Sequence, residues 1–266
     1  MFKTLRKYLG VSVYVFIITL LFFGCMNLKT HVNLNHTKSK TESFKHVKVD
    51  KKFKKGAENF VYLVKEVSPL LPEMCDHMPG PCEPMVASSA SGLVLSSDNS
   101  SIFVLTAAHF CSSLGEDINL FHETIYGLAA DQQRILFPLR IDIENDICLL
   151  MGPKIKGEHF NNIEVASKFT VGEKIYTVAA PLGIGGSGIR LIFQGNLGGC
   201  DARGCLSTIP ATFGSSGGGI YNKKGQLITI VMAVPETFDN VTISPSNTAL
   251  INFIRDIDSE VDIYPY

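Results

Sequence analysis

Three short segments of the sequence carry residue types that together could hydrolyse an amide bond. They are TAAH, which ends in His109, NDICLL, which contains Asp146, and GSSGGG, which contains Ser216. Amide hydrolysis at neutral pH needs a hydroxyl nucleophile, an imidazole that takes its proton and a carboxylate that orients the imidazole. The segments therefore predict a catalytic triad in which His109 is the base, Asp146 the orienting acid and Ser216 the nucleophile.

The glycine-rich tract around Ser216 could also supply donors for the oxyanion that forms during acyl transfer. Glycines allow sharp turns and let a substrate carbonyl approach the main chain closely. We expect the N–H groups of Gly214 and Ser216 to form an oxyanion hole, in which one donor contributes about 3 to 4 kcal/mol. A flexible linker is the alternative, but the apolar run LITIVMAV follows closely, and linkers seldom lie between core strands.

His109 and Asp146 each lie beside an apolar run that predicts a strand. His109 follows SIFVLT and two alanines, and Asp146 directly precedes ICLL. A lone histidine or aspartate at a strand end is more often structural. Because all three segments occur together and in this order, the catalytic interpretation is favoured.

From about Glu58 onward the chain predicts an all-β fold with one helix at its end. Short apolar runs alternate with clusters of Gly, Pro, Asn and Ser. The apolar spacing of NTALINFIRDI predicts a helix over 247–257, with Ser246 or Asn247 as its N-cap. The expected strands are Phe60–Val64, Ser91–Leu95, Ile102–Thr106, Ile135–Ile141, Ile147–Met151, Lys174–Ala179, Arg190–Gly195, Gly218–Tyr221 and Leu227–Val234.

The motifs TAAH, NDICLL and GSSGGG, in this order, resemble those of the trypsin-like (chymotrypsin-fold) serine peptidases. The runs ASGLVLS, GQLITIVMAV and ISPSNTALINFI resemble the protease domain of the HtrA/Deg branch, over about residues 57–257. The resemblance implies two six-stranded antiparallel β-barrels with the active site between them and a C-terminal helix. It also implies that His109, Asp146 and Ser216 match the family's base, acid and nucleophile.

The sequence departs from the family pattern at two places near the triad. Ser215 stands where the family most often has Asp or Asn, a position that supports the oxyanion loop. Phe110 separates His109 from Cys111, whereas vertebrate relatives place a cysteine directly after the histidine. The usual disulfide of the family is therefore not expected there.

The resemblance also points to residues that would contact the substrate side chain before the scissile bond. The family lines this S1 pocket with a residue about six positions before the nucleophile and with the strand after it. The corresponding residues in this sequence are Pro210, Met232, Ala233 and Val234. None of them carries a negative charge, so small or medium apolar P1 side chains are expected.

Residues 1–27 have the features of a targeting segment. Lys3, Arg6 and Lys7 precede an uncharged apolar run from Tyr8 to Gly24. Its length lies between a signal-peptide core and a full membrane span, so a cleaved signal peptide and a retained transmembrane anchor both stay open. Lipidation of Cys25, as in bacterial lipoproteins, is a third option.

The predicted organisation is therefore a signal or anchor over 1–27, a Lys-rich linker over 28–56 and a protease domain over 57–266. We expect membrane association through the N-terminal segment with the domain on the periplasmic or extracellular side, or secretion if the segment is cleaved. The net charge of −1 gives no reason to expect a nucleic-acid partner.

Seven cysteines are present, without the C-x2-C spacing of structural zinc sites. We therefore expect no metal, and no other cofactor. In an oxidising compartment the close pairs Cys75/Cys82 and Cys200/Cys205 could form disulfides, although Cys82 could instead pair with Cys111. Cys148, inside the apolar string ICLL, is interpreted as a small buried thiol.

Together these features predict a serine endopeptidase that cleaves exported or misfolded polypeptides through an acyl-enzyme intermediate. The alternative is a catalytically inactive binding module with the same fold, tethered to the membrane. The complete set of His109, Asp146 and Ser216 argues against that alternative, because a chain released from catalysis would be expected to lose one of them. The oligomeric state is left open.

Overall fold

The computed structural model describes residues 51–69, 83–112, 121–184, 189–235 and 240–261. These residues belong to one compact unit, Lys48–Tyr266. The predicted targeting segment, most of the predicted linker, and the cysteines at positions 25, 75 and 82 lie outside the described residues. Within the described part, no helix is long and apolar enough to cross a membrane.

Six strands of the N-terminal half close into an antiparallel barrel, in the order β1-β2-β3-β6-β5-β4. The barrel closes because β4 pairs with β1 along nine residues, from Val61 opposite Ala129 to Pro69 opposite Phe121. Its strands are β1 (Phe60–Pro69), β2 (Met85–Ser97), β3 (Ser101–Thr106), β4 (Phe121–Ala129), β5 (Gln132–Asp142) and β6 (Ile147–Pro153).

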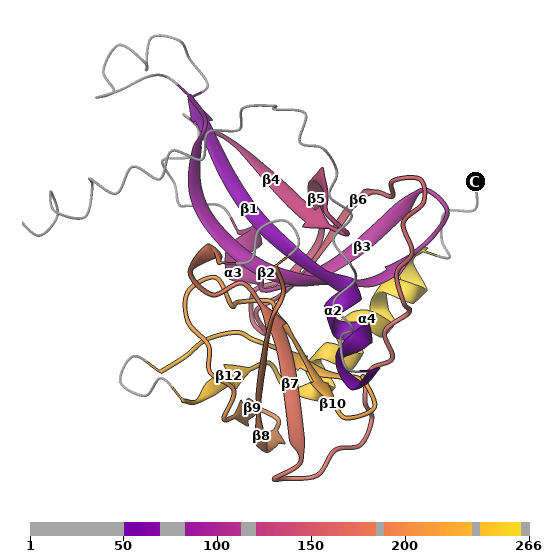
Figure 1. Cartoon of the computed structure of the whole chain (residues 1–266), viewed down its shortest axis with the longest axis vertical. Coiled ribbons are helices and arrows are strands. Elements are labelled where there is room, and N and C mark those ends of the chain that lie inside the picture. Colours follow the sequence, from indigo (N-terminus) through magenta and orange to yellow (C-terminus); the bar gives the residue numbers. More distant parts are fainter. Residues whose placement is uncertain (1–50, 70–82, 113–120, 185–188, 236–239, 262–266) are drawn as a thin grey trace, which may run out of the picture. The chain divides into compact units, whose positions relative to one another are not determined.

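The C-terminal half forms a second antiparallel sheet of six strands, in the order β11-β10-β7-β8-β9-β12. Its two edges meet just beyond β11, where Ala233 forms an isolated bridge with Ile243. Figure 1 shows the two groups of strands. The strands of this second barrel are β7 (Lys174–Ala179), β8 (Leu191–Asp201), β9 (Gly204–Ser207), β10 (Gly219–Asn222), β11 (Leu227–Ile230) and β12 (Thr242–Ser244).

The predicted C-terminal helix is present as α4 (Asn247–Val261). Ser246 is its N-cap, since the Ser246 hydroxyl accepts a hydrogen bond from the Ala249 N–H at 3.1 Å. Leu250 and Phe253 on one face of the helix are buried. The predicted all-β fold with two six-stranded barrels and a C-terminal helix is thereby confirmed.

Two short helical elements precede β1, within residues that the sequence analysis assigned partly to the linker. They are a 3-10 turn, Lys51–Phe53, and α2 (Lys54–Asn59). Gly56 lies so close to the ring of Tyr221 that a Cβ there would come within 2.8 Å of it. The described residues 51–56, a few positions before the predicted boundary at 57, therefore already belong to the packed unit.

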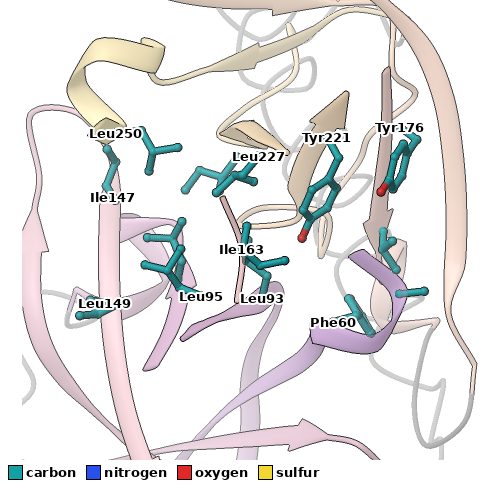
Figure 2. Packing of buried hydrophobic residues seen from close by; sticks show 14 of the residues in the cluster. Phe60, Leu93, Leu95, Ile147, Leu149, Ile163, Tyr176, Tyr221, Leu227 and Leu250 are labelled. Carbon is teal, nitrogen blue, oxygen red and sulfur yellow. The ribbon is translucent and has the colours of Figure 1, made fainter. Parts of the chain in front are cut away.

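Three clusters of buried apolar side chains stabilise the unit. One fills the first barrel and one fills the second. The third lies between the barrels, where Leu93, Leu95 and Leu149 of the first face Tyr221 and Leu227 of the second. Figure 2 shows this interface cluster, with Leu250 of α4 beside Leu227. The barrels are thus joined by a continuous apolar layer.

A buried ion pair links strand β5 of the first barrel to the loop that follows β6. Arg134 of β5 donates to both carboxylate oxygens of Glu158, one of them at 2.7 Å. Arg134 also donates to the carbonyls of Ala129 and Pro153. Burial alone would raise the pKa of the Glu158 carboxyl, but hydrogen bonds from Arg134 and from the Ile155 N–H outweigh burial and lower this pKa below its ordinary value.

The nine predicted strands are all present, with boundaries that differ by a few residues. Three further strands, β4, β9 and β12, were not predicted. In β4 the inward positions include Gly127 and Ala129, which leaves no clear apolar alternation in the sequence. β11 ends at Ile230 rather than Val234, because Met232 and Ala233 turn away to hydrogen-bond with Ile243 of β12.

Candidate active site

His109 and Asp146 form a directly hydrogen-bonded pair at the edge of the first barrel. His109 lies in a single helical turn, α3 (Ala108–Cys111), immediately after β3. Its ring atom Nδ1 lies 2.8 Å from Asp146 Oδ2, and its backbone N–H donates to Asp146 Oδ1 at 2.7 Å. An ionised carboxylate can only accept, so Nδ1 carries the proton and Nε2 is left as the acceptor. The ring is half exposed (51%), and a substrate can therefore reach it.

The tight turn that connects β5 to β6 sets the orientation of the Asp146 side chain. Asp146 has a left-handed backbone, with φ of +54°, a conformation that Asp adopts more readily than most residues. Its N–H points to the Ile143 carbonyl at 3.4 Å. Asp142 closes the turn by accepting hydrogen bonds from the backbone and side chain of Asn145.

A disulfide between Cys111 and Cys148 connects the two segments that carry this pair. Cys111 lies two residues after His109, and Cys148 lies two residues after Asp146. The interpretation of Cys148 as a free buried thiol is therefore wrong. Its apolar surroundings were recognised correctly, but the partner cysteine lies on a neighbouring element, which the sequence around Cys148 does not reveal.

The Ser216 loop takes its shape from two glycines with left-handed backbones. Gly214 has φ of +86°, and a Cβ there would lie 2.5 Å from the Ala180 carbonyl oxygen. Gly217 has φ of +82°, and a Cβ there would lie 2.2 Å from Thr106 Oγ1. Only glycine fits either position. Because Thr106 ends the strand that leads to His109, the contact at Gly217 places the Ser216 loop against the His109 segment.

Ser91 of β2, which the sequence analysis did not single out as functional, joins the Ser216 loop to the first barrel. Its N–H donates to the Ser216 carbonyl at 2.8 Å. Its hydroxyl donates to the Gly214 carbonyl at 2.7 Å and accepts from the Ala180 N–H at 2.9 Å. The Ser91 carbonyl accepts from the Thr106 hydroxyl. A buried serine within the apolar run SGLVL is the sequence signal that could have drawn attention to it.

The backbone N–H groups of Gly214 and Ser216 differ from those of their neighbours. Within the part of the chain that the structure describes, neither N–H donates a hydrogen bond, whereas Ser215 and Gly217 on either side both donate. The Ser216 hydroxyl lies 3.5 Å from the Met232 carbonyl oxygen. Among the described residues it makes no hydrogen bond to His109.

The sequence between residues 90 and 230 matches the family model of the trypsin-like peptidase domain. This match covers more than half of the chain. The protein belongs to the trypsin-like peptidase family.

Two solved structures share the fold of this trypsin-like peptidase. One is Rv3671c from M. tuberculosis H37Rv, as a serine-to-alanine mutant in an inactive form, with a TM-score of 0.56, 12% identity, and coverage of 79% of this chain and 91% of that chain. The other is the active form of the Rv3671c protease, with a TM-score of 0.53, 14% identity, and coverage of 74% and 79%. No curated protein matches the sequence. The closer relation to the HtrA/Deg branch stays a prediction.

The predicted substrate-binding residues of the trypsin-like peptidase lie in different surroundings. The Met232 carbonyl lies close to the Ser216 hydroxyl, and Ala233 beside Met232 is exposed. Val234 is half-buried and Pro210 is exposed. None of these side chains carries a charge, as the sequence analysis noted.

Two further features that the sequence analysis singled out are Ser215 and the cysteine pair Cys200/Cys205. Ser215 is buried, and its hydroxyl accepts a long hydrogen bond, 3.3 Å, from the Thr212 N–H. Cys200 and Cys205 form a disulfide across the β8–β9 hairpin. Within the described ranges, no group of His, Cys, Asp and Glu side chains could hold a metal ion.

Proposed function

We propose that the protein is a serine endopeptidase in which His109, Asp146 and Ser216 act as the catalytic triad. The observation that carries this proposal is the hydrogen-bonded His109–Asp146 pair. Beside it lies the Ser216 loop, in which the N–H groups of Gly214 and Ser216 donate no hydrogen bond to any described residue. The first element supplies an oriented base, and the second supplies a nucleophile and an oxyanion site. Membership in the trypsin-like peptidase family supports the same chemistry.

In the proposed first step, the Ser216 hydroxyl turns from the Met232 carbonyl to Nε2 of His109 and attacks the carbonyl carbon of the scissile bond. His109 takes the hydroxyl proton, and Asp146 stabilises the resulting imidazolium through Nδ1. The amides of Gly214 and Ser216 donate to the oxyanion.

In the second half of the reaction, His109 returns the proton to the leaving amine as the C–N bond breaks, which leaves an acyl-enzyme on Ser216. Water then gives one proton to His109 and attacks the ester. The tetrahedral intermediate collapses as its bond to the Ser216 oxygen breaks; His109 returns the proton to that oxygen, which restores the hydroxyl and releases the carboxylic acid product.

The proposed substrates are exported or misfolded polypeptides with small or medium apolar P1 side chains. Two disulfides among the described residues support a domain that works in an oxidising compartment, since disulfides persist there and are rare in the cytosol. Association with a membrane through residues 1–27 belongs to the same proposal and rests on the sequence.

Labelling with a fluorophosphonate probe tests the proposal, because this probe reacts with a serine that is activated by a neighbouring base. The full-length protein should be labelled, Ser216→Ala should not be, and the matched control Ser215→Ala should be labelled like the wild type. A folded wild type that is not labelled would contradict the proposal and would favour the inactive binding module.

A further inference from the structure

Lys65 is a charged residue in the interior of the first barrel. Alternate side chains of a strand point to the same face, and the inward series of β1, Val61, Leu63 and Lys65, is buried. Only 1% of the Lys65 side chain is exposed. An ammonium group inside a protein is costly unless it is paired, and an apolar side chain would fill the same place without that cost. A residue that contradicts the apolar pattern of its strand is typical of a position with a function.

The ammonium group of Lys65 contacts two residues of the segment that carries His109. Nζ donates a hydrogen bond to the Ser112 carbonyl at 2.8 Å. It also lies 5.6 Å from the centre of the Phe110 ring, a distance at which a cation is attracted to the face of the ring. The charge is balanced by Glu123 of β4, whose Oε2 lies 3.4 Å from Nζ. Lys65 therefore connects β1 to α3 and to the residue that follows α3.

Ser112 is the residue through which this contact reaches the proposed base. Its N–H donates to the Ala108 carbonyl at 2.8 Å, and its hydroxyl donates to the His109 carbonyl at 3.2 Å. Ser112 is thus bonded to His109 and to the residue before it, while its own carbonyl is held by Lys65. Because α3 has only four residues, it has little stability of its own, and contacts from outside the turn must keep it in place.

The other bonds that fix α3 lead toward the Asp146 segment. The His109 N–H donates to Asp146 Oδ1, and the disulfide joins Cys111 to Cys148 of β6. Lys65 holds the turn from β1, which is separated from β6 by two strands in the order of the barrel. A bond from this second direction restricts the rotation that attachment toward one side would permit.

We propose that Lys65 is a positioning residue for the reaction, which fixes the orientation of His109 by holding Ser112 in place. This inference rests on the proposed peptidase function. Lys65 transfers no proton in this role; it keeps Nδ1 of His109 directed at Asp146. A displacement of about 1 Å at a catalytic group can lower a rate about a hundredfold, so an ammonium group outside the site can affect catalysis strongly.

A kinetic comparison in the full-length protein tests the proposal. The double variant Lys65→Met/Glu123→Gln removes the ammonium group together with its charged partner, so neither charge of this pair is left behind. With a short peptide substrate we expect kcat to fall roughly tenfold to a hundredfold and KM to stay unchanged, because only the base is displaced. Glu123→Gln alone keeps the bond from Lys65 to Ser112, and its kcat should stay close to that of the wild type.

The matched control is Lys154→Met, which removes another lysine of the first barrel that donates to a backbone carbonyl. Lys154 Nζ lies 2.9 Å from the Asp98 carbonyl oxygen, in the turn between β2 and β3, which carries no residue of the proposed site. This variant should have the kcat of the wild type. An unchanged kcat in the double variant would overturn the proposal, as would an equal loss in Lys154→Met or in Glu123→Gln.

Proton NMR shows whether a loss of kcat comes from a displaced base. A proton in a short hydrogen bond to a carboxylate resonates far downfield, so the wild type should give such a signal from Nδ1–H of His109, which lies 2.8 Å from Asp146. Asp146→Asn removes the carboxylate and thereby assigns the signal. It should shift or disappear in Lys65→Met/Glu123→Gln and stay in place in Lys154→Met. An unshifted signal in the double variant would limit Lys65 to stabilising the barrel and would overturn the proposal.

Hydrogen exchange of the wild type keeps the proposal testable if the double variant does not fold. The Ser112 amide, which donates to the Ala108 carbonyl, should exchange slowly because Lys65 holds Ser112 in place. Exchange as fast as in an exposed loop would overturn the proposal. Failure of the peptidase proposal would appear separately, as absent fluorophosphonate labelling of a wild type that still gives the downfield signal.

Discussion

The two barrels hold their parts of the candidate active site by different means. In the first barrel, His109 and Asp146 are hydrogen-bonded to each other, and the Cys111–Cys148 disulfide connects the same two segments covalently. In the second barrel, the loop that carries Ser216 is held by backbone geometry and hydrogen bonds, and the Cys200–Cys205 disulfide closes a hairpin elsewhere.

Under the proposed assignment, the acid–base pair lies within one barrel, whereas the position of the proposed nucleophile depends on contacts between the barrels. Ser91 of the first barrel bonds both Gly214 and Ser216 of the second. The apolar layer between the barrels holds β2, which carries Ser91, against the second barrel. We therefore expect changes to the His109–Asp146 pair and its disulfide to act on base orientation and stability, and changes at Ser91 to act on the proposed oxyanion site.

The largest expected effect comes from breaking the acid–base pair. Asp146→Asn should lower kcat for a short peptide about ten-thousandfold, because the amide no longer selects the Nδ1–H form of His109. The control Glu144→Gln changes an exposed acid two residues away and should leave kcat within a factor of about two. Substantial activity in Asp146→Asn would mean that this pair does not orient the base.

The buried ion pair of the first barrel should contribute far more to the free energy of unfolding than the exposed ion pair of the second. Glu158→Gln leaves the buried Arg134 charge without a charged partner and should lower the free energy of unfolding by roughly 3 to 5 kcal/mol. Asp201→Asn, which breaks the exposed pair with Arg203, should change it very little. Urea unfolding at pH 7 measures both.

The same pair predicts a pH dependence. Since the folded-state pKa of Glu158 lies below its ordinary value of 4.5, its stabilising contribution is present above that value and is lost as the pH falls through the folded-state pKa. Glu158→Gln should lack this part of the acid-induced loss of stability. An unchanged acid transition in the variant would contradict the assignment.

The two disulfides allow the two barrels to be compared by the stability that each one loses when its disulfide is removed. Replacing both cysteines of the first-barrel disulfide by alanine should cost about 4 kcal/mol, and the same change in the second barrel about 2 kcal/mol. The reason is the length of chain that each one closes, with sequence separations of 37 and 5. Urea unfolding measures the free energy of unfolding of both variants. Equal losses in the two variants would argue against loop closure as the main effect. Only the first replacement should also lower kcat, because only that disulfide connects the His109 and Asp146 segments.

The smallest expected effect tests the bridge between the barrels. Ser91→Ala leaves the Gly214 carbonyl and the Ala180 N–H without a buried partner, a loss of about 1 to 3 kcal/mol. If this loss shifts Gly214, kcat should fall roughly tenfold to a hundredfold with little change in KM. Ser88→Ala, in the same strand, should behave like the wild type. A Ser91→Ala variant that loses stability but keeps its kcat would limit Ser91 to a structural role.

Much of the fold was predictable because it depends on local pattern. The runs SIFVLT and ICLL have the apolar character of buried strands, and both form strands within a residue or two of the predicted limits. β12 was not predictable, since TIS is too short to show a pattern and pairs only because β9 and Ala233 lie beside it. The segment 51–56 was assigned to the linker because its lysines resemble a solvated tether, although Gly56 and Ala57 pack against the second barrel.

The sequence by itself determined which residues are candidates for the chemistry of the site, because His109, Asp146, Ser216 and the glycines beside Ser216 all lie in short local motifs. Only the tertiary structure decided that Cys148 pairs with Cys111 and that Ser91 bridges the barrels. The physical reason is the same in each case. A disulfide and a long-range hydrogen bond are both defined by which distant segments come together, and that follows from the packing of the two barrels.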